Sequence, residues 1–447
     1  MKLSFEQYSV YRERATGGSM NTFNKGTKIE LETGEKVEVV KVLGDGGQGI
    51  VYLVHYKKKP YALKWYYPNR LRNAQQFKAN ISSNIKQGPP TDAFLWPQMI
   101  TRNQYGSFGY IMDLRPPEYE DFSRFLMAKV RFSSVAAVNN AALNIVNSFR
   151  ELHRCGYSYQ DINDGNFFIN PNSGDVLICD NDNVAQYGDN LGVAGKCRYM
   201  APEVVLGEKR PSVHTDRYSL AVTLFLLFFV SHPLEGSRTT CPCMTENLEK
   251  KFYGNEPIFI FDPHNDSNRP VRGIHNNAIK LWPIYPSFIR AAFEKSFGEG
   301  LKKENARLTE TQWQKLFVRL RDQTITCGCG AEVFLDSGSS DLQCRSCGKT
   351  IQTPLSLKVK NDLVALYPKS KLYKCHTQVD SDDFKEAVGE VIQSKSNPGL
   401  WGIRNISNTT WYMATPDGQQ KDIKPGGVVQ ILRGITIDFG KNRAEIV

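Results

Sequence analysis

Three polar residues in the middle of the chain could together take up a proton and bind a metal ion. Asp161 and Asn166 lie five residues apart in a polar stretch, and Asp180 follows the strand-like segment Val176 to Cys179. A carboxylate beside a hydroxyl group can accept its proton, whereas carboxylate and amide oxygens are ligands that Mg²⁺ prefers. These residue types therefore indicate a base and a metal site, with Asp182 as a less favoured second ligand.

A glycine-rich turn nearer the start of the chain could contact phosphate oxygens. It lies between the strand-like segments Val39 to Leu43 and Ile50 to Val54. Its glycines are Gly44, Gly46 and Gly49, and they are followed by Val51. Backbone amides without neighbouring Cβ atoms can approach a phosphate, but a tight hairpin that binds nothing would use glycine as well. The turn by itself leaves both interpretations open.

Lys64 favours the phosphate interpretation. It ends the strand-like stretch Tyr61-Ala62-Leu63-Lys64, one hairpin after the glycine turn. A lysine between apolar neighbours is costly to bury unless an anion accompanies it. An ATP phosphate would supply that anion.

Four cysteines further along the chain have the spacing of a metal site. They form two turn-like pairs, Cys327 with Cys329 and Cys344 with Cys347, separated by fourteen residues. Four thiolates fill a tetrahedral coordination shell, so we expect a structural Zn²⁺ that holds a small module together, with free cysteines as the alternative. The pair Cys241-Pro242-Cys243 could be half of another metal site, but no second pair lies near it in the sequence.

The helix ahead of Asp161 has recognisable ends. Ser133 or Ser134 can cap it, and Gly156 follows it. Apolar residues recur at helical spacing between these ends, at Val135, Val138, Ala142, Ile145, Phe149 and Leu152. The helix therefore leads directly into the polar stretch.

Two further segments have regular patterns. Ile29 to Val42 alternates in the manner of a hairpin, with Thr33-Gly34 at the turn. The apolar run Leu220 to Val230 is shorter than the roughly 18 to 20 residues that span a bilayer, so it predicts a buried helix.

The composition is that of a soluble protein with several domains. The chain has 447 residues, of which 40% are hydrophobic and 23% charged, so two or three domains are expected. Composition breaks predict a flexible N-terminus (1–25), a large domain (26–320), a zinc-ribbon module (324–353) and a C-terminal β-rich domain (357–447). An irregular insertion is expected between Arg238 and Arg272.

Charge and the N-terminal sequence restrict the expected partners. The net charge of +10 is spread along the chain instead of forming a basic stripe, so no nucleic acid is expected. Charged residues such as Glu6 and Arg12 stand where a signal peptide needs an apolar stretch. We therefore expect a cytoplasmic protein that does not associate with a membrane.

The ordered series of motifs from Gly44 to Arg307 resembles the protein kinase superfamily over roughly residues 26 to 320. The resemblance implies an α+β, bilobal fold with an antiparallel N-lobe sheet and a mostly helical C-lobe. It also implies transfer of the γ-phosphate of ATP to Ser or Thr of a protein substrate.

The resemblance assigns roles to single residues. Lys64 would contact the phosphates, Asp161 would be the catalytic base, and Asn166 and Asp180 would hold Mg²⁺ or Mn²⁺. The nucleotide site would further include the glycine turn, Val51, Ala62 and the adenine hinge Met112, Asp113 and Leu114. Scaffold roles fall to Asp216 and to the pair of Glu203 and Arg307.

The chain departs from the family at residues that orient the phosphate-binding lysine and at residues that regulate activity. No glutamate occurs between Lys64 and Asp113, so the usual helix glutamate is missing, and Gln75 or Gln76 is expected in its place. A pseudokinase that binds nucleotide without transferring phosphate is therefore an alternative, as is an adaptor whose zinc ribbon and β-rich tail bind partners.

The catalytic stretch and the following loop also differ from the family. Tyr159-Gln160-Asp161 replaces His-Arg-Asp, and no Ser or Thr lies between Asp182 and Tyr199, so we expect activity that does not depend on loop phosphorylation. Asn163 stands where the family has a lysine, and Lys196 where it usually has a threonine. We hypothesise that Lys196 reaches the transferring phosphate, with a solvated surface lysine as the alternative.

The region after the large domain adds two weaker resemblances. The Cys-Pro-Cys insertion, the Phe261-Asp262-Pro263 and Leu281-Trp282-Pro283 segments and the zinc ribbon resemble a bacterial kinase group linked to tellurite-resistance triads. This implies partnership with a PP2C-type phosphatase and a von Willebrand A domain protein. The tail from Leu400 to Gly440 faintly resembles a forkhead-associated sandwich, although a plain structural β sandwich is the favoured interpretation.

Overall fold

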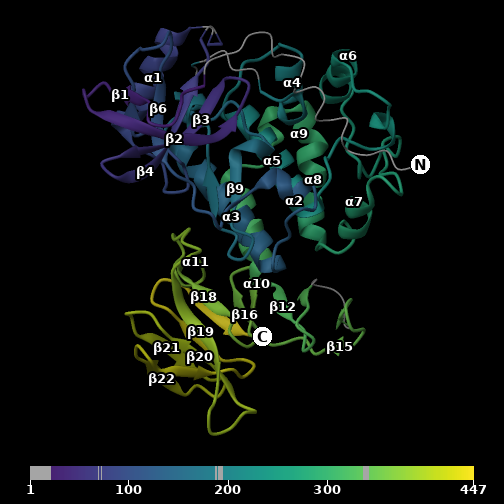
Figure 1. The fold of residues 1–447 in the computed structure, drawn as a ribbon. Coiled ribbons are helices and arrows are strands. Elements are labelled where there is room, and N and C mark those ends of the chain that lie inside the picture. The colour runs from purple at the N-terminus through teal and green to yellow at the C-terminus, as the bar shows by residue number, and fades with distance from the viewer. Residues whose placement is uncertain (1–21, 69, 72, 187–188, 190–194, 336–341) are drawn as a thin grey trace. The chain divides into compact units, whose positions relative to one another are not determined.

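Two compact units make up the described chain, which Figure 1 draws coloured from the N-terminus to the C-terminus. The computed structural model describes residues 22–68, 70–71, 73–186, 189, 195–335 and 342–447. The first unit comprises the described part of Met1–Pro89 together with Leu95–Arg115, and the second comprises Pro90–Phe94 and the described part of Pro116–Val447. Most of the expected N-terminal segment lies outside the described residues.

The first unit is an antiparallel sheet with strands in the order β1-β2-β3-β4-β6-β5. The strands are β1 (Lys28–Glu30), β2 (Lys36–Asp45), β3 (Gly49–Tyr56), β4 (Lys59–Tyr66), β5 (Met99–Ile100) and β6 (Gly109–Asp113). β1 and β2 form the predicted hairpin, with Gly34 at a φ of +85° in its turn. One face of the sheet buries apolar side chains, among them Val39, Tyr52, Leu63 and Ile111.

Helix α1 (Ala74–Gln87) belongs to this unit. Asn73 caps it by accepting the backbone N–H of Gln76 at 3.1 Å. The helix buries Phe77 and Ile81, and the ring of Phe77 packs edge-on against Tyr66 of β4 at a centroid distance of 5.4 Å. The side of the helix that packs on the sheet is therefore fixed by apolar residues one turn after its start.

The second unit is built around helix α5 (Val213–Phe229), in which every residue from Tyr218 to Phe229 is buried. This confirms the buried helix predicted from the apolar run. The other helices of the core are α2 (Phe122–Leu126), α3 (Val135–Arg154), α4 (Pro202–Val205), α7 (Asn276–Leu281), α8 (Ser287–Phe297), α9 (Glu299–Lys302) and α10 (Glu310–Asp322). Within the described residues, no helix has the length and apolar character needed to cross a membrane.

Short strands lie on both sides of α3 in the sequence. They are β7 (Glu120–Asp121), β8 (Tyr157–Ser158), β9 (Phe167–Ile169), β10 (Val176–Ile178) and β11 (Ala185–Gln186). The polar residues of interest lie in the segments that follow β8 and β10. Ser134 caps α3 by accepting the N–H of Ala137 at 3.0 Å, whereas the Ser133 hydroxyl donates to the carbonyl of Asn172. Of the two predicted caps, Ser134 is therefore the correct one.

The insertion between Arg238 and Arg272 is more regular than predicted. Thr245 caps the short helix α6 (Glu246–Glu249), which continues as a π-helical segment over Lys250–Asn255. Tyr253 in this segment is buried and donates to Glu235 at 2.7 Å. This long-range contact stabilises helical structure that the local composition does not indicate.

Two small modules follow α10. The cysteine module has β12 (Thr324–Thr326) paired with β13 (Glu332–Phe334), and β14 (Leu342–Gln343) paired with β15 (Thr350–Ile351). The β-rich domain has one sheet in the order β17-β16-β25-β24-β21-β22 and a second in the order β18-β19-β20-β23. These strands are β16 (Ser356–Val359), β17 (Asp362–Ala365), β18 (Lys371–Tyr373), β19 (Ala387–Gln393), β20 (Trp401–Asn405), β21 (Trp411–Ala414), β22 (Gln420–Ile423), β23 (Val428–Gln430), β24 (Thr436–Asp438) and β25 (Arg443–Ile446).

The two sheets of the β-rich domain share one apolar core. Leu357, Trp411 and Ile437 come from the first sheet, and Leu372 and Ile403 from the second. The domain is therefore a β sandwich, which agrees with the favoured interpretation of the tail. Its resemblance to a forkhead-associated domain stays a prediction.

Arg307 forms a buried ion pair with Glu203 that links the segment before α10 to helix α4. Its Nη1 and Nη2 atoms donate to the two carboxylate oxygens at 2.7 and 2.9 Å, and only 3% of the Arg307 side chain is exposed. The pairing predicted from the sequence is confirmed.

We expect Arg307→Ala to lower the free energy of unfolding by about 3–5 kcal/mol, because it leaves the Glu203 carboxylate without its buried partner. Urea denaturation of the full chain, followed by intrinsic fluorescence, measures this. Lys209→Ala is the matched control, since Lys209 pairs with Glu304 at the surface and its loss should hardly move the midpoint. Equal midpoints for both variants would contradict the expectation.

Candidate functional site

Asp161 lies in a polar loop of the second unit whose backbone is tightly hydrogen-bonded. The Asn163 amide donates to the Asp161 carboxylate at 3.0 Å, and its Oδ1 accepts the N–H of Gly165 at 3.0 Å. Asn163 thereby caps the 3₁₀ turn Asp164–Asn166 and orients the carboxylate of Asp161. The family's lysine at this position is thus replaced by an orienting amide instead of a charge.

Asn166 and Asp180 lie next to this loop. The Asn166 amide nitrogen donates to the Asp161 carbonyl at 2.8 Å, and the Asn166 carbonyl accepts the N–H of Cys179 at 2.9 Å. The Tyr159 hydroxyl also donates to the Cys179 carbonyl. The structure therefore brings Asp161, Asn166 and Asp180 together. With the Asn166 nitrogen already used, its oxygen and the Asp180 carboxylate form a set of hard donors that fits Mg²⁺.

Two residues of this region have a left-handed backbone. Gln160 has a φ of 68° and Asp180 a φ of 56°. Such conformations cost roughly 1 kcal/mol or more for residues other than glycine, and they persist where the surroundings hold them. They lie beside the candidate base and at the candidate metal ligand, which is where strained residues concentrate in functional sites.

Asp216, at the start of α5, holds the strained loop. Its carboxylate accepts the N–H of Tyr159 at 2.7 Å and the N–H of Gln160 at 3.2 Å, and only 2% of Asp216 is exposed. Its place in the first helical turn suits a negative charge, because the helix dipole is positive there.

His153, on the last turn of α3, contacts the same carboxylate. Its Nε2 lies 3.2 Å from Asp216 and its Nδ1 lies 3.0 Å from Glu310, which also pairs with Arg217 at 2.8 Å. Burial lowers the pKa of His153, but the hydrogen bonds to Asp216 and Glu310 outweigh it and raise the pKa to about 9. The ring is therefore protonated at neutral pH, and both nitrogens donate. Sequence reasoning missed this residue.

Lys196 lies beside the same loop. Its Nζ pairs with the Asp164 carboxylate at 2.7 Å, and a Cβ built on the preceding Gly195 would lie 3.2 Å from the Asp161 carboxylate. About half of the lysine side chain is exposed. Its partner Asp164 was not among the predicted site residues.

Four of the candidate nucleotide residues of the first unit share one face of its sheet. Val51 of β3 is opposite Lys64 of β4, and Ala62 is opposite Met112 of β6. Since opposite residues in antiparallel strands point to the same side, these four side chains line the face opposite the apolar core. Asp113 points the other way and is exposed, and Leu114 follows the strand.

The glycines of the turn have different reasons to be glycine. A Cβ at Gly49 would lie 2.0 Å from the Trp65 carbonyl oxygen, so that position requires glycine for packing. No neighbour lies within 4 Å of a Cβ at Gly44, and the nearest to one at Gly46 is 3.7 Å away. Among the described residues, no neighbouring atom demands glycine at these two positions, which is consistent with room for a ligand.

The prediction for the missing helix glutamate is wrong. Gln75 and Gln76 are exposed, because α1 begins at Ala74 and its first turn precedes the buried face. The polar residues on the buried side are Asn84, which is buried, and Asn80, which is half-buried. Neither is acidic, so α1 supplies no carboxylate to the sheet.

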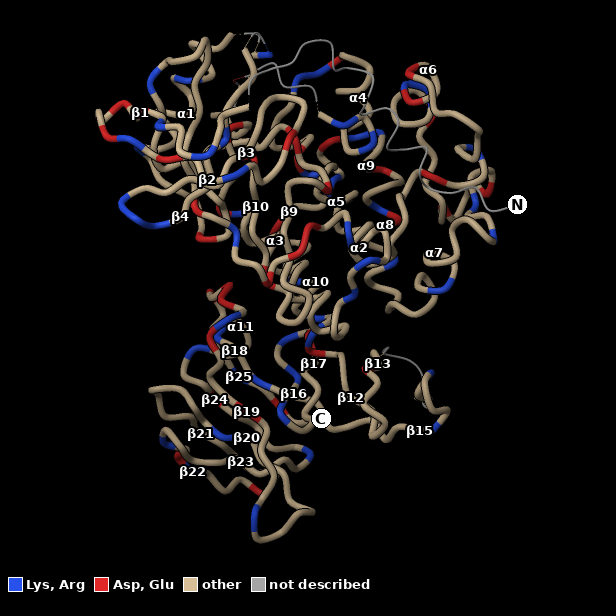
Figure 2. The backbone as a smooth tube through the Cα atoms, in the orientation of Figure 1, with Lys and Arg blue, Asp and Glu red and all other residues tan. Residues whose placement is uncertain are grey.

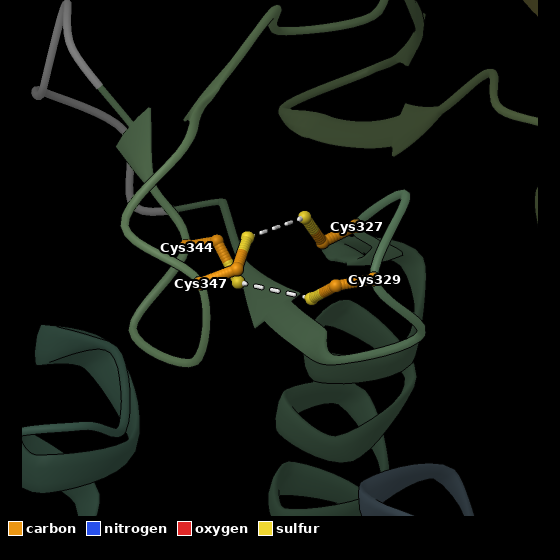
Figure 3. A group of neighbouring side chains, drawn as sticks. All are labelled: Cys327, Cys329, Cys344 and Cys347. Atoms are coloured by element: carbon orange, nitrogen blue, oxygen red, sulfur yellow. Dashed lines mark hydrogen bonds between the residues drawn. The ribbon is translucent and has the colours of Figure 1, made fainter.

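The four predicted cysteines converge in the second unit (Figure 3). All four sulfur atoms lie within 4.8 Å of one another, with Cys327 and Cys347 at 3.8 Å and Cys329 and Cys344 at 3.6 Å. Each pair sits on a turn that ends in a glycine of positive φ, 89° at Gly330 and 71° at Gly348.

The acidity of these thiols differs across the cluster. Backbone N–H groups of Cys347 and Ser346 lower the pKa of Cys344 to about 6. The neighbouring thiols oppose further ionisation, so a divalent cation would be needed to hold all four as thiolates. The soft, closed donor set fits a structural Zn²⁺.

The remaining cysteine pair gathers no metal ligands. Within the described ranges, the four-cysteine cluster is the only group of three or more potential metal ligands. The Cys241 thiol donates a hydrogen bond to the carbonyl of Cys243, and Cys243 is exposed.

Lysines and arginines are dispersed among acidic residues in both units (Figure 2).

Comparison with known proteins agrees with the geometry. A family model described as protein kinase domain matches residues 37–281, more than half of the chain. Among curated proteins, mitogen-activated protein kinase kinase 10 of Arabidopsis thaliana is 28% identical over 233 residues, which cover 50% of this chain and 73% of the relative.

We expect the purified chain to contain about one Zn²⁺, as four thiolates saturate one tetrahedral ion. Cys344→Ser and Cys347→Ser should each reduce the zinc content measured by plasma mass spectrometry and lower the melting temperature. Cys243→Ser is the matched control and should change neither value, because Cys243 lies outside the cluster. A metal-free wild-type chain with the same stability would contradict the zinc assignment.

Proposed function

Because the chain belongs to the protein kinase family, we propose that it transfers the γ-phosphate of ATP to a Ser or Thr hydroxyl of a protein substrate. The observation that carries the proposal is the hydrogen-bonded group of Asp161, Asn163 and Asn166 beside Asp180. This group contains a candidate base and two candidate metal ligands on a backbone that Asp216 holds in place.

Asp161 is the proposed base. Its carboxylate takes up the proton of the substrate hydroxyl as the oxygen attacks the phosphate. The Asn163 amide donates to this carboxylate at 3.0 Å and so orients it. Asn166 and Asp180 would hold Mg²⁺ or Mn²⁺, which neutralises charge on the phosphates when bound.

The first unit is proposed to bind the nucleotide. Lys64 would pair with the phosphates, which would compensate the charge of this nearly buried lysine. Val51, Ala62 and Met112 share its face of the sheet and offer apolar contacts for the adenine ring. The glycine turn would approach the phosphates with its backbone N–H groups.

We infer that the enzyme needs no phosphate on its loop. Gln160 stands where the family has an arginine that pairs with a loop phosphate, and its side chain donates to the Asp189 carbonyl at 2.7 Å. Arg198 is held in turn by Glu235 at 2.7 Å. The hydrogen bond of Gln160 and the ion pair of Arg198 would thus hold the loop in place of contacts to a phosphate group.

A pseudokinase is the second candidate function, and the absence of an acid on the buried face of α1 favours it. α1 supplies no carboxylate of the kind that orients the equivalent lysine in the family, and small misplacements of a reacting group are costly. This candidate predicts binding of Mg²⁺-ATP without phosphate transfer.

Asp161→Asn should reduce phosphate transfer to casein by about 10²-fold or more, because an amide cannot accept the proton. Radiolabelled ATP measures the rate, and mass spectrometry maps the modified Ser and Thr residues. Asp175→Asn, an exposed carboxylate on the β9–β10 turn, is the matched control. Treating the wild type with a phosphatase beforehand should leave its rate unchanged. Wild-type chain that binds ATP but transfers nothing would establish the pseudokinase instead.

Lys196→Met should lower turnover at saturating ATP by roughly tenfold, since the proposed role of its ammonium group is to neutralise charge on the transferring phosphate. Lys196→Arg keeps the charge and should retain most of the rate. Equal turnover for wild type and Lys196→Met would contradict this role and would favour the alternative that Lys196 is a solvated surface lysine.

A further inference from the structure

A segment of the β sandwich contacts α3, the helix that leads into the catalytic loop, and α10, which packs against α3. Residues 374–384, which we call the strap, lie between β18 and β19 and contain the short helix α11 (Lys374–Thr377) (Figure 1). The strap belongs to the second unit, as do α3 and α10.

The first attachment of the strap joins Asp382 to both helices. Arg150 of α3 donates to the Asp382 carboxylate at 3.0 Å and to the side chain of Gln314 on α10 at 2.6 Å. Gln314, itself buried, donates to the Asp382 backbone carbonyl at 3.1 Å. One strap residue therefore bridges α3 and α10.

The second attachment lies at the end of α10. His376 contacts Asp322 at 2.9 Å, and both side chains are nearly buried. Burial lowers the pKa of His376, but the charge of Asp322 outweighs it and raises the pKa to about 10. Arg321 donates to the Phe384 carbonyl at 2.8 Å, which closes the strap at its far end.

The same two helices hold the catalytic loop one turn away. Arg150 and His153 both belong to α3, and Gln314 and Glu310 both belong to α10. His153 bridges Glu310 and Asp216, and Asp216 accepts the backbone N–H groups of Tyr159 and Gln160. Two adjacent polar layers thus cross the α3–α10 pair, with the strap in the first and the loop in the second.

We propose that the strap is a positioning device for the catalytic loop, in which Asp382 and Arg150 fix the spacing of α3 and α10 so that His153 can hold Asp216. The proposal rests on the proposed kinase function for its effect on rate. His153 and Arg150 act through Asp216 and touch no substrate, so they are positioning residues.

The geometry explains why spacing matters. His153 reaches Asp216 and Glu310 with opposite ring nitrogens, so a shift of α10 relative to α3 lengthens at least one of the two hydrogen bonds. Asp216 would then be free to rotate, and the left-handed backbone of Gln160 would lose part of its support. The Asp382 carboxylate is 59% exposed, so it can be altered without opening the core.

Two readouts test the proposal on the full chain. Asp382→Ala should increase amide hydrogen exchange in the peptide that spans residues 157–166, and should lower kcat by about three- to tenfold with an unchanged KM for ATP, because misplaced catalytic groups reduce the rate of the chemical step. Asp382→Glu keeps the carboxylate, so it should restore much of the protection from exchange and much of kcat. Asp380→Ala, an exposed acid on the strap, is the matched control and should behave as the wild type.

A double-mutant cycle tests the route. In a His153→Gln background, Asp382→Ala should have a smaller effect on exchange than in the wild type, because the coupling passes through His153. Unchanged exchange in Asp382→Ala, or fully additive effects in the cycle, would overturn the proposal. A wild-type chain without phosphate transfer would refute the proposed function alone, since the exchange measurements still decide whether the strap orders the loop.

Discussion

The Asp216 carboxylate, which accepts two backbone N–H groups of the catalytic loop, is the interaction on which the second unit depends. It sits at the start of the most apolar helix of the chain, where an uncompensated charge would be costly. Its compensation comes from the loop amides, from the helix dipole and from the protonated ring of His153. The charge and the loop conformation therefore stabilise each other.

This arrangement accounts for the replacements in the catalytic stretch. Gln160 can keep its left-handed backbone because Asp216 holds its N–H, and its side chain then reaches Asp189. Tyr159 spans from the loop to the Cys179 carbonyl, directly before Asp180. The substituted residues thus make contacts that connect the candidate base, the candidate metal ligands and the following loop without a phosphate.

Local patterns predicted the parts of the structure that depend on neighbours in sequence. The Ser134 cap, the β1–β2 hairpin, the buried helix and the cysteine turns all follow from residues within a few positions of one another. The prediction for Gln75 and Gln76 was wrong because neighbouring positions on a helix face different sides. Both glutamines are exposed, whereas the next residue, Phe77, is buried. His153 and Asp164 were missed because their roles come from partners distant in sequence, which an amphipathic pattern cannot reveal.

The cysteine module contacts the N-terminal end of α3, at the opposite end from His153. Glu332 of β13 accepts the N–H groups of Val135 and Ala136, the latter at 3.1 Å, so a carboxylate from outside the kinase domain caps the first turn of the helix. The strap contacts Arg150 near the last turn. Both segments that follow α10 therefore attach to α3, the helix that leads into the catalytic loop. A metal bound by the four cysteines would order the module that contains Glu332, and the cysteine module and the sandwich would then both support the helix that precedes the candidate catalytic loop.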